Sequence, residues 1–295
     1  FSYSNVMNLT EFSLDEAKKR GRNQYYLFEK QDYKKFLRKN ALTQELRQSI
    51  NHNFEGFEAY FQPLIQTKDQ KIYGAEALMR YHSSQFGDVS PTEFIPILEE
   101  TNMIIPAGRW ILDRAAAACR DFQTLIPDFK ISINLSYVQV LNSYVGSDVI
   151  RTVQKYGISP DSLTIELTES GLLETDSHLK KMWTYLKKEG ISLALDDFGT
   201  GYSNFAYLAT LRPDTIKIDR EFTCRALHNS YEYQLLALCS SMAHYLRLSI
   251  CIEGVETAEE LSAVRKLSPD YIQGYFFGRP CDYDTFFNTY IKAAV

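Results

Sequence analysis

The sequence has few cysteines and few histidines, and this restricts its chemistry. It contains five of each, scattered along the chain without the ligand spacing of a zinc site or the partners of a His-based catalytic triad. Most of the cysteines fall in apolar segments. We therefore expect buried free thiols and a cytoplasmic, reducing location.

The sequence also lacks a long hydrophobic run and an excess of positive charge. No apolar segment is long enough to cross a bilayer and no signal-peptide pattern is present, so we expect no membrane contact by the chain itself. The formal net charge is -5, so the chain as a whole should not attract DNA. Hydrophobic residues make up 45% of the 295 residues, which is enough for a sizeable core.

From about residue 58, short β-prone segments alternate with helix-like segments. The expected strands are 58–64, 72–80, 130–136, 163–169, 192–198, 215–219, 248–252 and 271–277. Eight strands alternating with helices predict an α/β fold, a (β/α)₈ TIM-like barrel. Only residues 65–71 join the first two strands, too few for a crossover helix, so we expect the first strand to run antiparallel to the second.

The segment before the barrel is too small to be a full domain. Its pattern predicts helices at 14–20 and 32–51 and a strand at 24–28. We therefore divide the chain into the remnant of an upstream domain, a linker helix and the barrel, at residues 1–30, 31–55 and 56–295.

The linker helix carries an apolar stripe. The stripe consists of Leu37, Leu42, Leu46 and Ile50. An isolated helix could not hide these side chains from water, so the stripe must pack on the barrel, on the N-terminal remnant or on a second copy. One hypothesis is simple docking on the barrel. The other is a lever, through which an upstream domain moves the helix and changes activity.

Two adjacent carboxylates, Asp196 and Asp197, follow the apolar stretch 191–195. Like charges this close raise each other's pKa unless a cation neutralises them. One aspartate bridging two metal ions, with its neighbour on the second, is one solution. The alternative is ordinary turn chemistry, with one aspartate capping a helix and the other facing solvent.

Further oxygen ligands occur late in, or just after, other expected strands. They are Glu76, Asn134, Glu166 and Glu253, and the lysine Lys217 holds a similar place. In a barrel, the C-terminal strand ends meet on one rim, where the chemistry of this fold is placed. A set made only of carboxylates and one amide suits Mg²⁺ or Mn²⁺.

The run Glu76-Ala-Leu-Met-Arg80 resembles the signature of the EAL domain, the cyclic di-GMP phosphodiesterases of bacterial signalling. The resemblance continues, in order, from residue 58 to the end. It includes Phe61-Gln-Pro-Leu64, Asn134-Leu-Ser136, Glu166-Leu-Thr-Glu-Ser170, Asp196-Asp-Phe-Gly-Thr-Gly-Tyr-Ser203, Ile216-Lys-Ile-Asp219, Glu253-Gly-Val-Glu-Thr257 and Gln273-Gly-Tyr-Phe-Phe-Gly-Arg-Pro280. Residues 14–28 resemble the C-terminal tail of a GGDEF domain. No Gly-Gly-Asp-Glu-Phe motif is present, so we expect no synthesis of cyclic di-GMP.

The resemblance implies a hydrolase that linearises cyclic di-GMP to pGpG with two Mg²⁺ or Mn²⁺ ions per site. The implied metal ligands are Glu76, Asn134, Glu166, Asp196 and Asp197. Lys217 would orient and activate the attacking water, Glu253 would hold that water, and Glu169 would anchor the loop that begins at Asp196. The alternatives are ion-paired or capping roles in the barrel.

Five residues are implied as substrate contacts. Arg80 would clamp phosphate, since guanidinium matches phosphate oxygens. Gln62 and Gln273 would contact a guanine edge or ribose, and Leu78 and Tyr275 would supply apolar contact. Packing alone is the alternative for the last four.

Three further expectations concern assembly and function. By resemblance, the loop with Tyr202 and Ser203 is a candidate contact in a homodimer, and Gly199 and Gly201 would permit its geometry. The first competing function is a catalytically inactive sensor that binds cyclic di-GMP. The second is another metal-dependent phosphoesterase on the same barrel.

Overall fold

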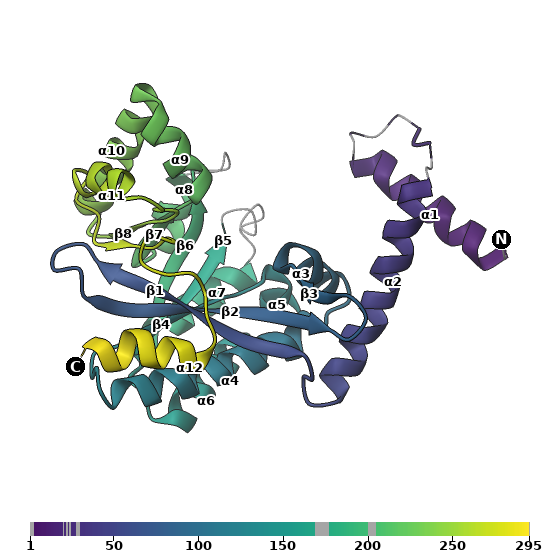
Figure 1. The fold of residues 1–295 in the computed structure, drawn as a ribbon, viewed down its shortest axis with the longest axis horizontal. Helices are drawn as coiled ribbons and strands as arrows, with labels where there is room; N and C mark the ends of the chain where they lie inside the picture. Colours follow the sequence, from purple (N-terminus) through teal and green to yellow (C-terminus); the bar gives the residue numbers. More distant parts are fainter. Residues whose placement is uncertain are drawn as a thin grey trace.

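Eight strands close into a barrel in the computed structural model, which describes residues 3–19, 21, 23, 25–27, 30–168, 177–199 and 205–294 (Figure 1). The barrel strands, in spatial order, are β1 (Phe57–Gln66), β2 (Ile72–Ser83), β4 (Lys130–Asn134), β5 (Leu163–Thr168), β6 (Ser192–Phe198), β7 (Thr215–Ile218), β8 (Ser249–Ile252) and β9 (Tyr271–Ile272). Strand β9 pairs with β1 and closes the ring. The predicted barrel is confirmed.

The first strand is antiparallel, as its short connection predicted. β1 pairs antiparallel with β2, from Phe57 opposite Tyr81 to Ile65 opposite Ile72. It is also antiparallel to β9, whereas the pairs from β2–β4 round to β8–β9 are parallel. One strand was not predicted, β3 (Gly87–Val89), which pairs with the far end of β2.

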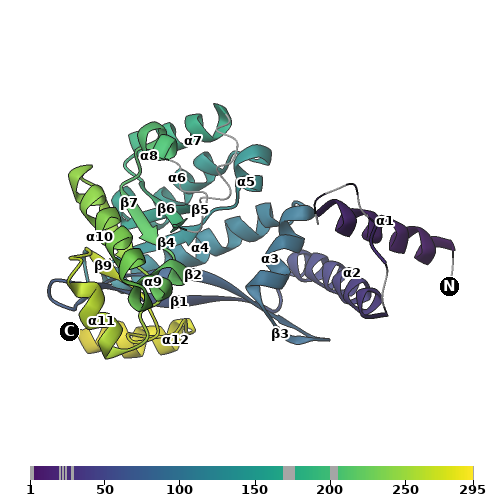
Figure 2. The ribbon, with the colours of Figure 1, turned by 90° about the horizontal axis from the view of Figure 1, so that it is seen from above.

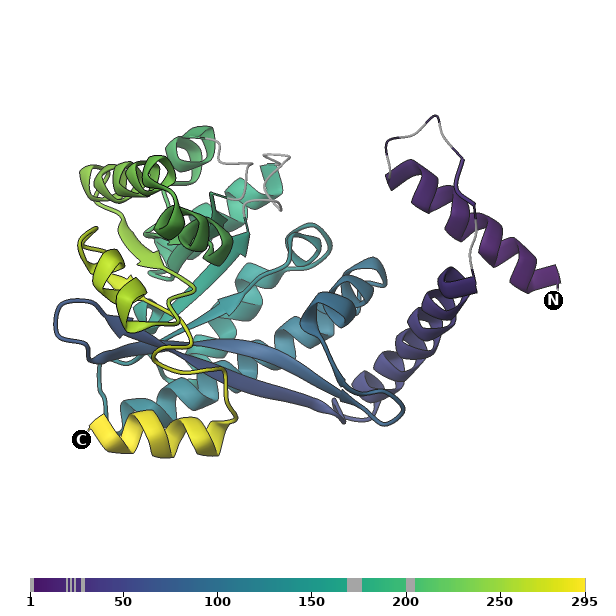
Figure 3. The same cartoon turned by 45° about the horizontal axis from the view of Figure 1, so that its top comes forward.

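Helices surround the barrel (Figures 1 and 3). They are α3 (Pro91–Glu100), α4 (Ile104–Gln123), α5 (Tyr137–Asn142), α6 (Val145–Tyr156), α7 (Ser177–Lys188), α8 (Phe205–Leu211), α9 (Arg220–His228), α10 (Ser230–Tyr245), α11 (Ala258–Arg265) and α12 (Tyr283–Phe286), with short helical turns at Pro160–Ser162, Phe287–Ile291 and Lys292–Ala294. Side-chain caps start two of them within two residues of a strand, Ser136 on α5 and Asp219 on α9, and Thr257 caps α11 after the turn that follows β8. These caps end the strands at the rim, so the polar residues beside them stay there.

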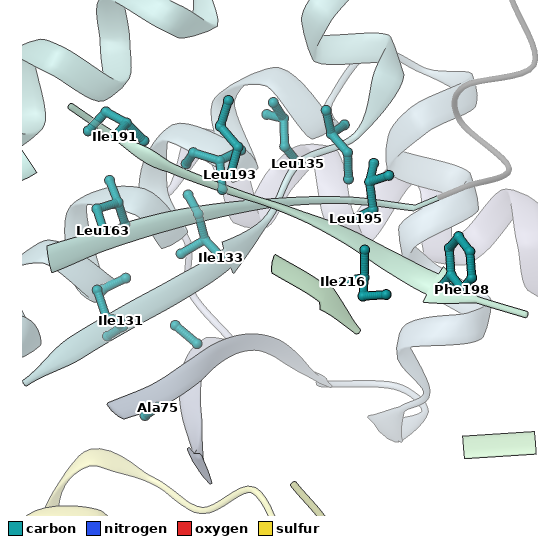
Figure 4. Packing of buried hydrophobic residues seen from close by; sticks show 14 of the residues in the cluster. Ala75, Ile131, Ile133, Leu135, Leu163, Ile191, Leu193, Leu195, Phe198 and Ile216 are labelled. Carbon is teal, nitrogen blue, oxygen red and sulfur yellow. The ribbon is translucent and has the colours of Figure 1, made fainter. Parts of the chain in front are cut away.

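The main core lies between the strands and the helices. Figure 4 shows strand residues such as Ile131, Ile133 and Leu193 in this layer. They pack with helix residues including Ala115 and Trp183. Because strand side chains alternate, the residues between them face the barrel interior.

The N-terminal segment forms two helices, α1 (Tyr3–Lys19) and α2 (Lys30–Asn51), which lie to one side of the barrel (Figures 1 and 2). The strand predicted at 24–28 is wrong for residues 25–27, which belong to no strand, and residues 24 and 28 lie outside the described residues. Too few neighbouring strands are available there to pair with such a short segment. No helix among the described residues has the length and hydropathy needed to cross a membrane.

The apolar stripe on α2 docks on the chain's own barrel. Leu42 and Leu46 are completely buried in a second core cluster with Phe57 and Phe94. By contrast, Leu37 is 47% exposed. The docking hypothesis therefore describes the structure, and only part of the predicted stripe is used.

Candidate active site

Lys217, from β7, lies at the centre of the rim with its side chain only 4% exposed. Its Nζ atom is 2.6 Å from Glu166 Oε2 and 2.8 Å from Glu253 Oε1. It is also 3.2 Å from Glu76 Oε2 and 3.5 Å from Asp196 Oδ1. Four separate strands, or the turns after them, thus present one carboxylate each to a single ammonium group.

Amide side chains hold Glu76 in place. Asn134 Nδ2 donates to Glu76 Oε1 at 2.6 Å, and Gln273 Nε2 donates to Glu76 Oε2 at 2.7 Å. Gln273 Nε2 also lies 3.1 Å from Gln62 Oε1, and Gln62 Nε2 donates to the Gly278 carbonyl at 3.3 Å. These bonds fix the carboxylate plane of Glu76, so the predicted residues Asn134, Gln62 and Gln273 belong to one connected network.

The backbone at Asp196 and Asp197 is irregular. The pairing of β6 with β7 shifts between Leu195 and Phe198, and Asp197 has a φ of 57°. Such left-handed residues and bulges are found next to active sites, where they redirect side chains. The Asp197 N–H donates to Asp196 Oδ1 at 3.0 Å. Gly199, with a φ of 102°, follows, and a Cβ there would come within 2.4 Å of the Phe222 ring.

Burial makes several of these carboxylates hard to ionise. Burial, partly offset by Lys217, raises the pKa of Glu166 to about 8. Burial and the charge of Asp196 raise the pKa of Asp197 to about 6. For the same primary reason, burial, the pKa values of Asp196 and Glu253 are raised.

The pKa values of Glu76 and Lys217 are shifted in the direction that favours their charged forms. Burial disfavours the charge on Glu76, but Lys217 and the amides of Gln273 and Asn134 outweigh it, so the Glu76 pKa is lowered. Burial also disfavours the Lys217 charge, yet the surrounding carboxylates hold its pKa well above the ordinary value. The surrounding carboxylates therefore favour the protonated form of Lys217, which donates hydrogen bonds to them.

The residues of the rim fit divalent cations by their charge and their donor atoms. The set Glu76, Glu166, Asp196, Asp197 and Glu253 carries five carboxylates against the single ammonium of Lys217. Among the described residues, no three Asp, Glu, His or Cys side chains are gathered in a group that could hold a metal ion as they stand, and four of the carboxylates point to Lys217 instead. Glu253 Oε1 is buried without a hydrogen-bond partner of suitable angle in the described chain, although Lys217 is close. An excess of oxygen donors with unsatisfied charge is what Mg²⁺ or Mn²⁺ requires.

Two hollows flank the acidic centre. The larger, about 520 Å³, is lined by Leu78, Arg80 and Asn134, among others. Arg80 is partly buried there, with its Nη1 donating to the Met79 carbonyl at 2.8 Å and its guanidinium 5.5 Å from the Tyr60 ring. The predicted pair Leu78 and Arg80 therefore faces one side of the site.

The smaller hollow, about 130 Å³, is lined by Gln62, Glu253, Gln273 and Tyr275. The sequence analysis missed Arg220, which also lines it, with its guanidinium 5.6 Å from the Tyr275 ring. The available signal was its place directly after Ile216-Lys-Ile-Asp219. The predicted residue Glu169 lies outside the described residues, as do Gly201, Tyr202 and Ser203.

Comparison with known families identifies the family to which a chain with this site belongs. The EAL domain matches residues 43–280, which is most of the chain. The chain belongs to the EAL domain family. The match begins within α2, ahead of the barrel boundary expected at residue 56.

Two curated relatives are about 30% identical to the chain over the residues that align. It is 33% identical over 278 residues to the oxygen sensor protein DosP of Escherichia coli, covering 93% of this chain and 34% of that protein. It is 30% identical over 279 residues to the bifunctional diguanylate cyclase/cyclic di-GMP phosphodiesterase MucR of Pseudomonas aeruginosa, covering 93% and 40%. The chain thus spans between 34% and 40% of the length of these two relatives.

Two solved structures of related proteins have a fold similar to that of this EAL domain. The structure of the PaMucR phosphodiesterase in complex with c-di-GMP is 30% identical, with a TM-score of 0.77, and covers 83% of this chain and 99% of that one. The cAMP- and cyclic-di-GMP-bound form of the EAL enzyme Bd1971 is 28% identical, with a TM-score of 0.81, covering 96% and 74%.

Proposed function

We propose that this EAL domain hydrolyses cyclic di-GMP to linear pGpG with the help of divalent cations. The observation that carries the proposal is the convergence of Lys217 with Glu76, Glu166, Asp196 and Glu253 at one end of the barrel. A relative at 30% identity is named as a cyclic di-GMP phosphodiesterase, and a solved relative is a complex with c-di-GMP. Both support this substrate.

The shape of the site suits a ligand with two similar halves. Cyclic di-GMP carries two guanines and two phosphodiesters, and the acidic centre has a hollow on each side. Each hollow offers one arginine, Arg80 or Arg220, to compensate phosphate charge. We assign Arg80 as the phosphate clamp, with Leu78 and Tyr275 as apolar contacts on opposite sides.

The chain's own residues would divide the chemistry as follows. Glu76, Asn134, Glu166, Asp196 and Asp197 would hold the cations. The chemistry that Mg²⁺ or Mn²⁺ supplies, when bound, is neutralisation of charge on the phosphate and on the nucleophile. Each of these residues lies on a strand or directly at its end, so the barrel holds them in position without further ordering.

Lys217 and Glu253 are the residues best placed to handle the attacking water. Lys217 would donate to the water oxygen and orient it, while Glu253, whose Oε1 atom lies 2.8 Å from Lys217 Nζ, would accept a hydrogen bond from it. Attack of that oxygen on one phosphorus forms the new P–O bond and breaks the bond to the 3′ oxygen. The water loses a proton and the 3′ oxygen gains one, so the opened ring is pGpG with a 5′ phosphate and a 3′ hydroxyl. The role proposed for Lys217 is therefore to position the water and to supply positive charge.

The test is direct incubation of the chain with cyclic di-GMP and Mg²⁺ or Mn²⁺, with product separation by chromatography. Formation of pGpG that stops on addition of EDTA is the expected result. Binding without turnover would favour the inactive sensor instead. Absence of both binding and turnover would refute the proposal.

We also propose a domain division, an oligomeric state and a location for the chain. Residues 1–30 would be the tail of a GGDEF-like domain and 31–55 its linker, in keeping with a bifunctional relative that aligns over 93% of this chain. We further propose a homodimer working in the cytoplasm. Sedimentation of the chain with and without cyclic di-GMP tests the dimer.

A further inference from the structure

A ring of hydroxyl groups lies inside the barrel, just below the acidic rim. One residue comes from each strand from β4 to β8: Ser132, Thr164, Ser192, Thr215 and Ser249. Thr164 stands two residues before Glu166, and Thr215 two residues before Lys217. Because side chains on a strand alternate, each threonine shares the inner face with the rim residue that follows it.

The strand register aligns these hydroxyl residues in two adjoining sets. Thr164 is paired with Ser132 on one side and with Ser192 on the other. Thr215 is paired with Ser249. Between β6 and β7 the register steps by two residues, because Thr215 is paired with Ala194 and not with Ser192. The ring therefore consists of two aligned sets on neighbouring strands.

The ring of hydroxyl residues encloses open space. TIM barrels usually fill their interior with bulky branched side chains. Here all five hydroxyl residues line a cavity of about 140 Å³, which we call the inner cavity. Glu166 and Lys217 line it as well, as does Asp214, which precedes β7. The aromatic rings of Tyr73 and Tyr271, which also line it, stack with centroids 4.1 Å apart.

The hydroxyl groups of the ring lack protein partners. Within the ranges that the structure describes, none of the five makes a side-chain hydrogen bond to another protein group. Ser132 is buried, whereas the other four residues are only partly buried, so water can reach this layer. A space of about 10–15 Å³ is enough for one water, so the inner cavity has room for several. Its walls supply the polar partners that a buried water needs.

We propose that the inner cavity is a hydration site whose ordered waters connect the hydroxyl ring to the undersides of Glu166 and Lys217. Thr164 and Thr215 are then positioning residues, because they act on the rim through these waters. The catalytic consequence rests on the proposed function, whereas the hydration itself does not. These waters keep the lower ends of the Glu166 and Lys217 side chains solvated while substrate covers the acidic rim above them.

A pair of substitutions separates hydrogen bonding from packing. Thr164→Val keeps the shape but removes the hydroxyl, and Thr164→Ser keeps the hydroxyl but removes a methyl group. We expect Thr164→Val to lower kcat about tenfold with little change in KM, and Thr164→Ser to stay within about twofold of wild type. A merely structural role would change the melting temperature of both variants and leave the kcat of the folded enzyme unchanged. Equal kinetics for the two variants would overturn the positioning role.

Crystallography of the whole chain at high resolution tests the hydration without using activity. We expect ordered waters within hydrogen-bond distance of at least three ring hydroxyls, and their loss or displacement in Thr164→Val. If that variant does not fold, Ser192→Ala provides the same measurement with a smaller change. An inner cavity without ordered water would overturn the inference. If wild type makes no pGpG, the proposed function fails, and the water positions still decide the hydration.

Discussion

The acidic rim and the α2 seam differ in how well their groups are satisfied. We define the α2 seam as Leu42 and Leu46 packed on the barrel, flanked by the ion pair of Arg38 and Glu93. In the seam, apolar groups meet apolar groups and the flanking charges are matched one to one. In the rim, four carboxylates share one ammonium group.

This difference indicates what each region contributes. Burial of leucines stabilises the folded chain, whereas buried charges of like sign oppose folding unless cations balance them. When a protein keeps unbalanced buried charge in one region and pairs its polar and apolar groups elsewhere, the unbalanced region is usually a functional site. The predictions below test that division between stability in the seam and activity in the rim.

The largest effect is expected at Asp196. Asp196→Asn keeps the shape but removes one charge of the proposed cation site, so turnover of cyclic di-GMP should fall by about 10³-fold or more. Since burial raises the pKa of Asp196, its charge is unfavourable in the fold, and the variant should melt at the same temperature or higher. The measurements are pGpG formation with Mg²⁺ and thermal unfolding. Near-normal turnover would contradict the cation assignment.

Replacing Mg²⁺ with Ca²⁺ tests the same proposed cation site. Ca²⁺ prefers more ligands at longer distances than Mg²⁺, so it should occupy the rim without supporting hydrolysis. Titration of Ca²⁺ into a Mg²⁺ assay should therefore inhibit pGpG formation. Activity that persists in a large excess of Ca²⁺ would count against this.

Lys217→Ala should act on rate rather than affinity. The proposed partner of the ammonium group is the attacking water, so we expect kcat to fall by about 10²–10³-fold with a smaller change in KM. The variant also leaves buried carboxylates without their cation, so it should unfold more easily. Steady-state kinetics, with circular dichroism as the folding control, make the comparison. A change mainly in KM would reassign Lys217 to substrate binding.

Arg80→Ala should show the reverse pattern. A phosphate clamp acts on the ground state and the transition state alike, so KM should rise by about tenfold or more, at least as much as kcat falls. Lys217→Ala serves as the matched variant from the same rim. If Arg80→Ala lowered only kcat, its role as a clamp would be wrong.

In the seam, Leu46→Ala should affect stability alone. Leu46 is completely buried, so truncation should lower the free energy of unfolding by about 2–5 kcal/mol. The kcat of the folded variant should remain within about twofold of wild type. Unfolding in urea and the turnover assay test this. A large change in turnover with the fold intact would favour α2 as a lever that transmits an upstream signal.

The smallest effect is expected at the edge of the same seam. Arg38 makes a bidentate pair with Glu93 at 2.6 and 3.0 Å, but the two side chains are 39% and 36% exposed. Arg38→Ala should therefore cost less than about 1 kcal/mol, and the difference should shrink at high salt. A loss as large as that of Leu46→Ala would mean that charge pairing, and not apolar burial, holds α2 in place.

Local features of the sequence determined most of the fold. Alternating apolar segments predicted the eight strands, and the short connection at 65–71 predicted the antiparallel β1, because a chain of that length can only form a hairpin there. The strand-end positions of Glu76, Asn134, Glu166 and Lys217 predicted that they would meet, since the topology of a barrel brings those ends to one rim. These properties depend on neighbours in sequence, so periodicity and spacing reveal them.

Tertiary structure decided which groups became partners. The sequence did not show that Lys217 would take four carboxylates, that Arg220 would lie over Tyr275, or that Leu42 would be buried while Leu37 stayed exposed. Nor did it show β3, or that the hydroxyl residues of five strands would enclose one cavity. Each of these depends on strand register and on closure of the barrel, which bring together residues far apart in sequence. No local pattern encodes such distances, because the same segment has different neighbours in a different register.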